Sequence, residues 1–176
     1  MKKVIVIGCP GSGKSVFSRE LHSITGLPLY PIDTIYWRAD RTAITREELI
    51  KRLCEICGTD EWILDGNYSS TMELRMSYCD TVVFLDYPTD VCYEGIMKRR
   101  GKARPDLPWI EPTDEIDGEF VNAVLQYNTV NRPAALEMIK RFPGREVYIF
   151  NSRSEASGFL DSLRNGAADR RTGDKD

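Results

Sequence analysis

Residues 4–15 read VIVIGCPGSGKS, and this stretch decides the fold. It begins with an apolar, β-branched run, which is typical of a strand buried on both faces of a parallel sheet. The run leads into the pattern G-x-x-x-x-G-K-[ST], whose glycines allow backbone amides to converge on phosphate oxygens at the start of a helix. Phe17, Leu21 and Ile24 then recur at helical spacing. The sequence therefore predicts a strand, a phosphate-binding loop and a helix, with a nucleotide as the ligand of the loop.

The side chains of this loop have separate expected roles. Lys14 can reach the β- and γ-phosphates of a nucleotide and stabilise charge there, and Ser15 can ligate Mg²⁺. We expect the nucleotide to be bound by Gly8, Gly11, Ser12, Gly13, Lys14, Ser15 and Val16. The alternative is a glycine-rich turn without a ligand, but the buried strand before the motif and the amphipathic helix after it argue against that alternative.

Apolar segments and helical periods alternate along the rest of the chain. Further extended segments are expected at residues 27–32, 62–64, 81–85 and 146–150. Of the helical patterns between them, one opens with a capping box at residues 45–48, and another, over residues 120–139, contains Pro133 as a break. This order predicts an α/β fold of three layers, with a mostly parallel five-stranded sheet and helices on both faces. We expect one domain over residues 1–164 and a flexible polar tail over residues 165–176.

Composition and charge argue against several classes of protein. The 176 residues include 24 Lys and Arg against 27 Asp and Glu, and a net charge of −3 disfavours direct binding of nucleic acid. No apolar run approaches the ~18 residues that a membrane span needs, and no secretory signal is expected. The 5 cysteines lie in strand and helix patterns, which predicts reduced thiols in the cytoplasm. Cys54 and Cys57 fall within a helical period, so we expect a structural role for them.

The class of nucleotide-binding protein depends on residues outside the loop. A guanine-reading N-K-x-D segment is absent, and the chain is short for a large mechanochemical ATPase. Asp86 closes an apolar strand, and we expect its carboxylate to hold Mg²⁺ through water. The alternative for Asp86 is a strand-end acid that caps the next helix.

Three stretches carry a resemblance to a known family. Residues 32–37, 62–69 and 99–106 read IDTIYW, WILDGNYS and RRGKARPD. They resemble the bacterial "DNA topology modulation protein" family, among the adenylate-kinase-like P-loop kinases, and the likeness spans residues 3–163. The resemblance implies a parallel sheet ordered 2-3-1-4-5 with a lid over about residues 99–118.

The same resemblance suggests further site residues. Arg99 matches a lid arginine that contacts phosphate, and Arg132 looks like the arginine that returns from the helix after the lid. Gly95 stands where adenylate-kinase relatives carry an arginine that covers the adenine ring. We therefore expect Asn151 and Arg153, after the fifth strand, to contact the base instead. For any one arginine the alternative is a solvated helix end, where the helix dipole favours a cation.

The acceptor of the phosphoryl group is expected on the other side of the crevice. Asp33 follows the second extended segment, at the edge where parallel strands form ligand sites, and can orient or deprotonate a hydroxyl. A phosphate acceptor would need cations instead, which Arg38 and Arg75 are placed to supply. Three aromatic residues nearby, Tyr36, Trp37 and Tyr68, can stack on a planar acceptor or serve only in packing.

Together these features predict an ATP- and Mg²⁺-dependent phosphotransferase that acts on a small acceptor, such as a nucleoside or nucleotide, as a monomer or homodimer. Lys14, Asp33, Arg99 and Arg132 are its expected catalytic residues. Two alternatives stay open. One is a nucleotide-dependent regulator that affects DNA topology, and the other is a P-loop ATPase without a small acceptor.

Overall fold

The computed structural model describes residues 1–102, 105–107 and 118–172. Its sheet has five strands, β1 (Lys3–Gly8), β2 (Leu29–Pro31), β3 (Trp62–Asp65), β4 (Thr81–Leu85) and β5 (Glu146–Phe150). They are ordered β2-β3-β1-β4-β5, and every neighbouring pair is parallel. The expected fold class and strand order are therefore confirmed.

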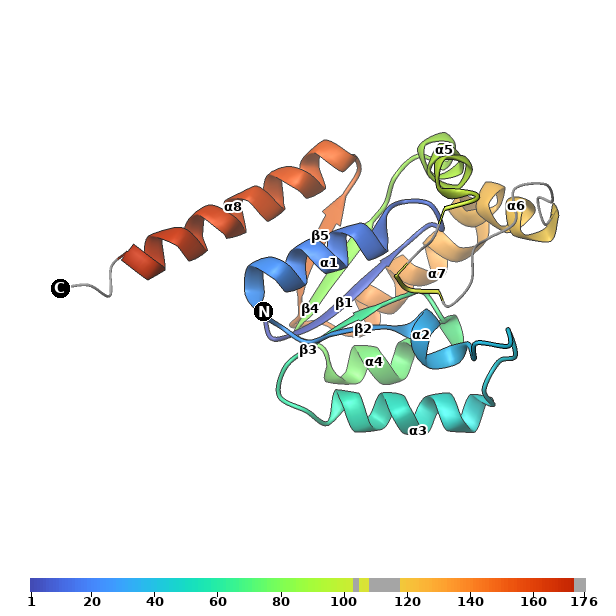
Figure 1. Cartoon of the computed structure of the whole chain (residues 1–176), viewed down its shortest axis with the longest axis horizontal. Helices are drawn as coiled ribbons and strands as arrows, with labels where there is room; N and C mark the ends of the chain where they lie inside the picture. Colours follow the sequence, from blue (N-terminus) through green and yellow to red (C-terminus); the bar gives the residue numbers. More distant parts are fainter. Residues whose placement is uncertain (103–104, 108–117, 173–176) are drawn as a thin grey trace.

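Helices cover both faces of this sheet (Figure 1). The helices are α1 (Lys14–Thr25), α2 (Ile32–Tyr36), α3 (Arg46–Cys57), α4 (Met72–Tyr78), α5 (Thr89–Arg99), α6 (Gly118–Leu125), α7 (Tyr127–Arg141) and α8 (Arg153–Thr172), with a 3₁₀ turn at Ser69–Thr71. α1 and α8 pack together on one face, and α3, α4 and α7 cover the other. The central strands are consequently buried on both sides, which is why they read as continuous apolar runs.

Local sequence signals explain where several helices begin and end. The Thr45 hydroxyl accepts a hydrogen bond from the Glu48 amide at 3.1 Å and caps α3, as the capping-box pattern predicted. Gly26 ends α1 in the left-handed conformation, and its amide bonds to the His22 carbonyl. These caps fix the lengths of the helices that carry the phosphate loop and cover the sheet.

The helical regions near the C-terminus differ from the expectation in two places. The break in the long helical pattern falls at Gln126, between α6 and α7, while Pro133 lies inside α7. A proline removes one amide donor, and the turns around it hold the helix together. In addition, α8 extends to Thr172 and includes residues 165–172, which we had placed in a flexible tail. Much of the expected lid, residues 103–104 and 108–117, lies outside the described residues.

None of the helices in the described ranges is both long enough and apolar enough to cross a bilayer.

Candidate active site

The carboxyl ends of the central strands meet at one edge of the sheet, where Val6 pairs with Asp65 and Gly8 with Leu85. A cavity of about 790 Å³ opens at this edge, between the phosphate loop, the ends of β2 and β3, and helices α5 and α8. Predicted site residues in its lining are Gly11, Ser12, Gly13, Lys14, Ser15, Val16, Asp33, Arg99 and Arg153. One cavity thus collects the residues expected at the nucleotide and at the acceptor, at the edge where parallel sheets bind ligands.

The phosphate loop makes a compact turn in which Gly11 and Gly13 adopt left-handed backbone conformations that favour glycine. Gly11 has a φ of 84°, and a Cβ there would lie 2.0 Å from the Cys92 carbonyl oxygen in α5. Gly13 has a φ of 96° and caps α1, since its carbonyl accepts the amides of Val16 and Phe17. The turn places the positive end of the α1 dipole beside the cavity, where it favours a phosphate group.

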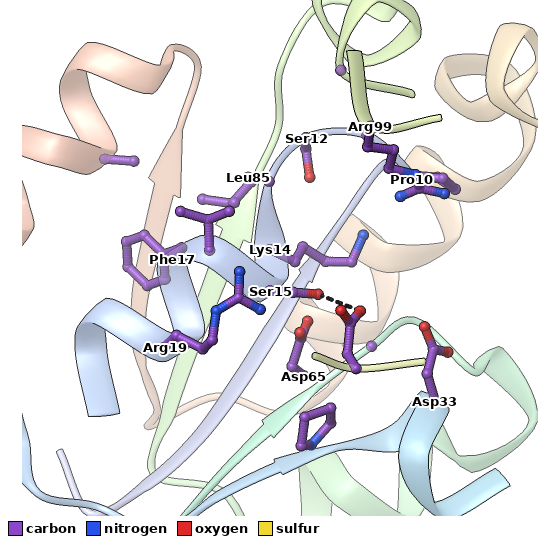
Figure 2. Close-up of a pocket in the computed structure, with 18 of the residues that line it drawn as sticks. Pro10, Ser12, Lys14, Ser15, Phe17, Arg19, Asp33, Asp65, Leu85 and Arg99 are labelled. Carbon is purple, nitrogen blue, oxygen red and sulfur yellow. Dashed lines mark hydrogen bonds between the residues drawn. The ribbon is translucent and has the colours of Figure 1, made fainter. Parts of the chain in front are cut away.

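Lys14 supplies a half-buried cation at the centre of the cavity (Figure 2). Its Nζ donates hydrogen bonds to the carbonyl oxygens of Gly8, at 2.9 Å, and Cys9, at 3.1 Å. Loss of hydration lowers the pKa of Lys14, and the charges of Asp65 and Asp33 oppose that shift. The ammonium group therefore lies beside the loop backbone and close to two carboxylates, within the lining of the site that the phosphates would enter.

Asp65, the last residue of β3, received no role in the sequence analysis, yet it belongs to the site. The side chain is 5% exposed, and Oδ1 has no hydrogen-bond partner in the part of the chain that the structure describes. Burial raises the pKa of Asp65 to about 6, although the charge of Lys14 and a hydrogen bond from Ser15 act in the opposite direction. The signal in the sequence was the same as for Asp86, because both residues close apolar strands.

The donor set around Asp65 fits Mg²⁺ bound together with a nucleotide. Among the described residues, no group of three or more His, Cys, Asp or Glu side chains is placed to hold a metal ion. Mg²⁺ at nucleotide sites usually takes one or two carboxylates from the protein and several oxygens from phosphates and water. The Ser15 hydroxyl and the unpartnered oxygen of Asp65 can provide the protein ligands of such a set.

Asp86 and Arg132 bind each other. Both are among the described residues, and neither lines the cavity. Arg132 Nε donates to the two carboxylate oxygens of Asp86 at 2.7 and 3.0 Å, and Nη2 donates to Oδ2 at 2.8 Å. We had expected Asp86 at the magnesium ion and Arg132 at the transferred phosphate. The arrangement differs from that expectation because the Asp86 carboxylate faces α7. Asp65, at the end of the other neighbour of β1, lies in the cavity beside Ser15 instead.

Asp33 and Tyr68 form the wall of the cavity opposite the loop. The Tyr68 hydroxyl donates a hydrogen bond of 2.8 Å to Asp33 Oδ1. Tyr36 meets the Tyr68 ring nearly edge-on at 5.1 Å between centroids, and Trp37 meets Tyr36 at 4.9 Å. Tyr68 is the one of these three aromatic residues in the cavity lining, so the other two pack behind it.

Arg75 has a structural position beneath this wall and does not reach the acceptor side. It is fully buried, and its guanidinium donates to the carbonyl oxygens of Gly66, Asn67 and Tyr68. Tyr68 has a φ of 35°, a left-handed conformation that residues other than glycine rarely adopt. The three hydrogen bonds hold the backbone in that conformation and so aim Tyr68 at Asp33. Arg38, the other cation considered for the acceptor, is exposed and pairs with a glutamate of α3.

The structure places the two residues expected at the base, Asn151 and Arg153, differently. Arg153 lines the cavity and donates from Nη2 to the Val91 carbonyl oxygen at 3.1 Å. Asn151 lies outside the lining. Gly95 packs so closely on the phosphate loop that a Cβ would lie 2.0 Å from the Gly11 carbonyl oxygen. The absence of an arginine side chain at this position is therefore a requirement of the packing between α5 and the loop.

Arg99 lines the cavity at the end of α5, together with Lys98 and Lys102. Its guanidinium carbon lies 5.8 Å from the centre of the Phe120 ring, which connects α5 with α6. In Figure 2 the Arg99 side chain lies next to Pro10 of the phosphate loop. The expected lid arginine is thus at the cavity.

The sheet order and the loop after β1 define the class: the chain has the fold of the P-loop kinases. It is similar to the structure of shikimate kinase from Acinetobacter baumannii in complex with shikimate, with a TM-score of 0.59 and 14% identity over 93% of this chain and 90% of that one. It is also similar to a gluconokinase from Sinorhizobium meliloti, with a TM-score of 0.55 and 15% identity over 95% and 91% of the two chains.

Among curated proteins the chain resembles the adenylate kinase of Thermotoga maritima, at 27% identity over 123 residues. The match covers 66% of this chain and 55% of the adenylate kinase, so the chain spans little more than half of that relative's length. No protein-family model matches the chain. The narrower likeness to the "DNA topology modulation protein" family stays a prediction.

Proposed function

We propose that this protein is an ATP- and Mg²⁺-dependent phosphotransferase that transfers the γ-phosphoryl group to a hydroxyl of a small acceptor. The observation that carries the proposal is one cavity in which the phosphate loop, Lys14 and Ser15 lie opposite Asp33. The fold shared with P-loop kinases and the adenylate kinase relative support it. The 5 free cysteines are compatible with the reducing cytoplasm that we propose as its location.

Different residues of the chain would have different roles in such a transfer. The loop amides, Lys14 and Arg99 would bind phosphate oxygens and stabilise the charge that spreads over them in the transition state. Ser15 and Asp65 would hold Mg²⁺, which when bound neutralises charge on the nucleotide phosphates. Asp33 would accept the proton of the acceptor hydroxyl. Tyr68 would orient the Asp33 carboxylate through its hydrogen bond to Oδ1.

The acceptor wall favours a hydroxyl compound over a nucleoside monophosphate. Among the described residues, this wall includes Pro31, Asp33, Gly66, Asn67 and Tyr68. A phosphate acceptor needs cations, but Arg75 uses its guanidinium on three backbone carbonyls. A carboxylate beside a tyrosine ring is better suited to a neutral, ring-bearing molecule such as a nucleoside.

A phosphoryl-transfer screen tests the proposal directly. The protein is incubated with Mg²⁺ and γ-labelled ATP against nucleosides, nucleoside monophosphates and small alcohols, with Lys14→Ala as the blank. We expect a labelled organic product that is lost in the blank and strongly reduced in Asp33→Asn, while Asp33→Asn still binds ATP. The exposed Asp60→Asn serves as the matched control and should keep full activity.

Other outcomes would point to the alternative functions. Label released only as inorganic phosphate, whatever the acceptor, would contradict the proposal and favour a P-loop ATPase or a nucleotide-dependent regulator. A DNA gel shift that persists at physiological salt would favour the regulator, because non-specific electrostatic binding weakens steeply with salt.

A further inference from the structure

Asp106 belongs to the described segment between α5 and α6 and reaches the start of α1. Its Oδ2 accepts a hydrogen bond of 3.1 Å from the Ser15 hydroxyl, which is drawn as the dashed line at Ser15 in Figure 2. The side chain is 3% exposed, so the contact is enclosed by protein. A carboxylate from 91 residues away in the sequence is therefore buried against the hydroxyl that we assign to Mg²⁺.

Asp65 approaches the same hydroxyl from β3. Ser15, Asp65 and Asp106 all line the main cavity and also a smaller one of about 280 Å³ beside it. The Ser15 hydroxyl carries a single proton, which it donates to Asp106 Oδ2. A second buried carboxylate, Asp65, thus lies at this hydroxyl without receiving that proton.

Asp65 leaves one buried carboxylate oxygen open at this hydroxyl. Asp65 Oδ1 is buried without a hydrogen-bond partner in the described ranges, which is costly for an ionised group. Lys14, whose charge acts on Asp65, donates from Nζ to two carbonyl oxygens of the phosphate loop. Hard divalent cations prefer carboxylate and hydroxyl oxygens, and these are what the three side chains present.

We propose that Asp106 is a third protein ligand of the divalent cation, directly or through one water, beside Ser15 and Asp65. The inference rests on the proposed function, because the remaining ligands are the oxygens of the nucleotide. It adds to that function a ligand from the segment after α5, so that metal binding ties this segment to the phosphate loop. Magnesium usually takes one or two carboxylates, and Asp106 is the second.

Binding of Mn²⁺, observed by electron paramagnetic resonance in the presence of saturating ADP, tests this without any turnover. We expect Asp106→Asn to weaken Mn²⁺ binding roughly 10–100-fold, the range found when a group that supports a metal site is removed. ADP affinity in EDTA should be unchanged in the same variant. Glu94→Gln, which removes one negative charge from the exposed face of α5, is the matched control and should bind Mn²⁺ like the wild type.

A second variant controls for misfolding and tests whether a carboxylate is needed at position 106. Asp106→Glu keeps a carboxylate and should recover most of the Mn²⁺ affinity, which a purely structural hydrogen bond to Ser15 would not require. Unchanged Mn²⁺ affinity in Asp106→Asn would overturn the inference and leave Asp106 as a partner of Ser15 alone. Tighter Mn²⁺ binding would also overturn it, since Asp106 would then compete with the metal for Ser15.

The same experiment separates this inference from the proposed function. If the wild-type protein binds neither ADP nor Mn²⁺ with ADP, both fail together. If the wild type binds both and Asp106→Asn does so equally well, only the role of Asp106 fails.

Discussion

Asp65→Asn offers a sharp test, because the structure predicts that removing a site residue stabilises the protein. Burial raises the pKa of the Asp65 carboxyl from about 3.8 to about 6, so folding disfavours its ionised form. The pKa in the folded protein is about 2 higher than in the unfolded chain. At 1.36 kcal/mol per unit, the charge costs about 3 kcal/mol of folding free energy at pH 7.5. Asparagine has nearly the same shape and no charge, so the variant should regain most of this energy when nucleotide and metal are absent.

The pH dependence gives the sign of the effect. Since the pKa is higher in the folded than in the unfolded chain, the stability linked to Asp65 is complete below about pH 4 and is lost as the pH rises through about 6. The variant should therefore match the wild type near pH 4 and exceed it at pH 7.5. A gain of 3 kcal/mol corresponds to a rise in Tm of roughly 6–12 °C for a domain of this size.

Thermal and urea unfolding at pH 4.5, 6.0 and 7.5, without nucleotide or divalent cations, measure this difference. Asp60→Asn, in an exposed turn, should change stability by less than about 0.5 kcal/mol at every pH. The stabilised Asp65→Asn protein should also lose the Mg²⁺-dependent part of its ATP affinity. A variant that is less stable than the wild type at pH 7.5, or a difference that does not change with pH, would refute the assignment of Asp65 as an uncompensated buried charge.

Three further predictions follow from the packing around the site. Gly95→Ala should destabilise the protein by about 1–3 kcal/mol and weaken ATP binding in a titration, because the added Cβ meets the phosphate-loop backbone. The control is Gly158→Ala, in open space on α8, which should stabilise the protein by about 0.5–1 kcal/mol. Arg75→Met should cost about 3 kcal/mol in urea unfolding, since it leaves buried carbonyls unpaired; an unchanged midpoint would contradict its structural role. Alkylation of the native protein at pH 8, followed by peptide mass mapping, should modify the exposed Cys54 and spare Cys9, whose pKa is raised by contact with a neighbouring thiol and by burial. Equal labelling of the two cysteines would show that the loop opens to solvent.

The local sequence was sufficient for the phosphate loop and for the order of the elements. The loop follows from glycines, a lysine and a serine within residues 8–15, and its backbone conformation depends on those residues and their immediate neighbours. The strand order came from the family resemblance and is confirmed by the sheet. The position of the helix break at Gln126 was missed, because a proline does not always end a helix: Pro133 lies at an exposed position and α7 continues through it.

The tertiary structure decided which acidic and basic residues belong to the site. Asp65 and Asp86 give the same signal in sequence, a carboxylate after an apolar strand, and the strands that carry them flank β1 on opposite sides. Asp65 lies at Ser15, whereas Asp86 pairs with Arg132 of α7. Local patterns set the backbone conformation of each segment, but the partner of a charged side chain depends on which distant segments the packing of the sheet and helices brings into reach. This packing of distant segments buries Arg75 and brings Asp106 to the phosphate loop.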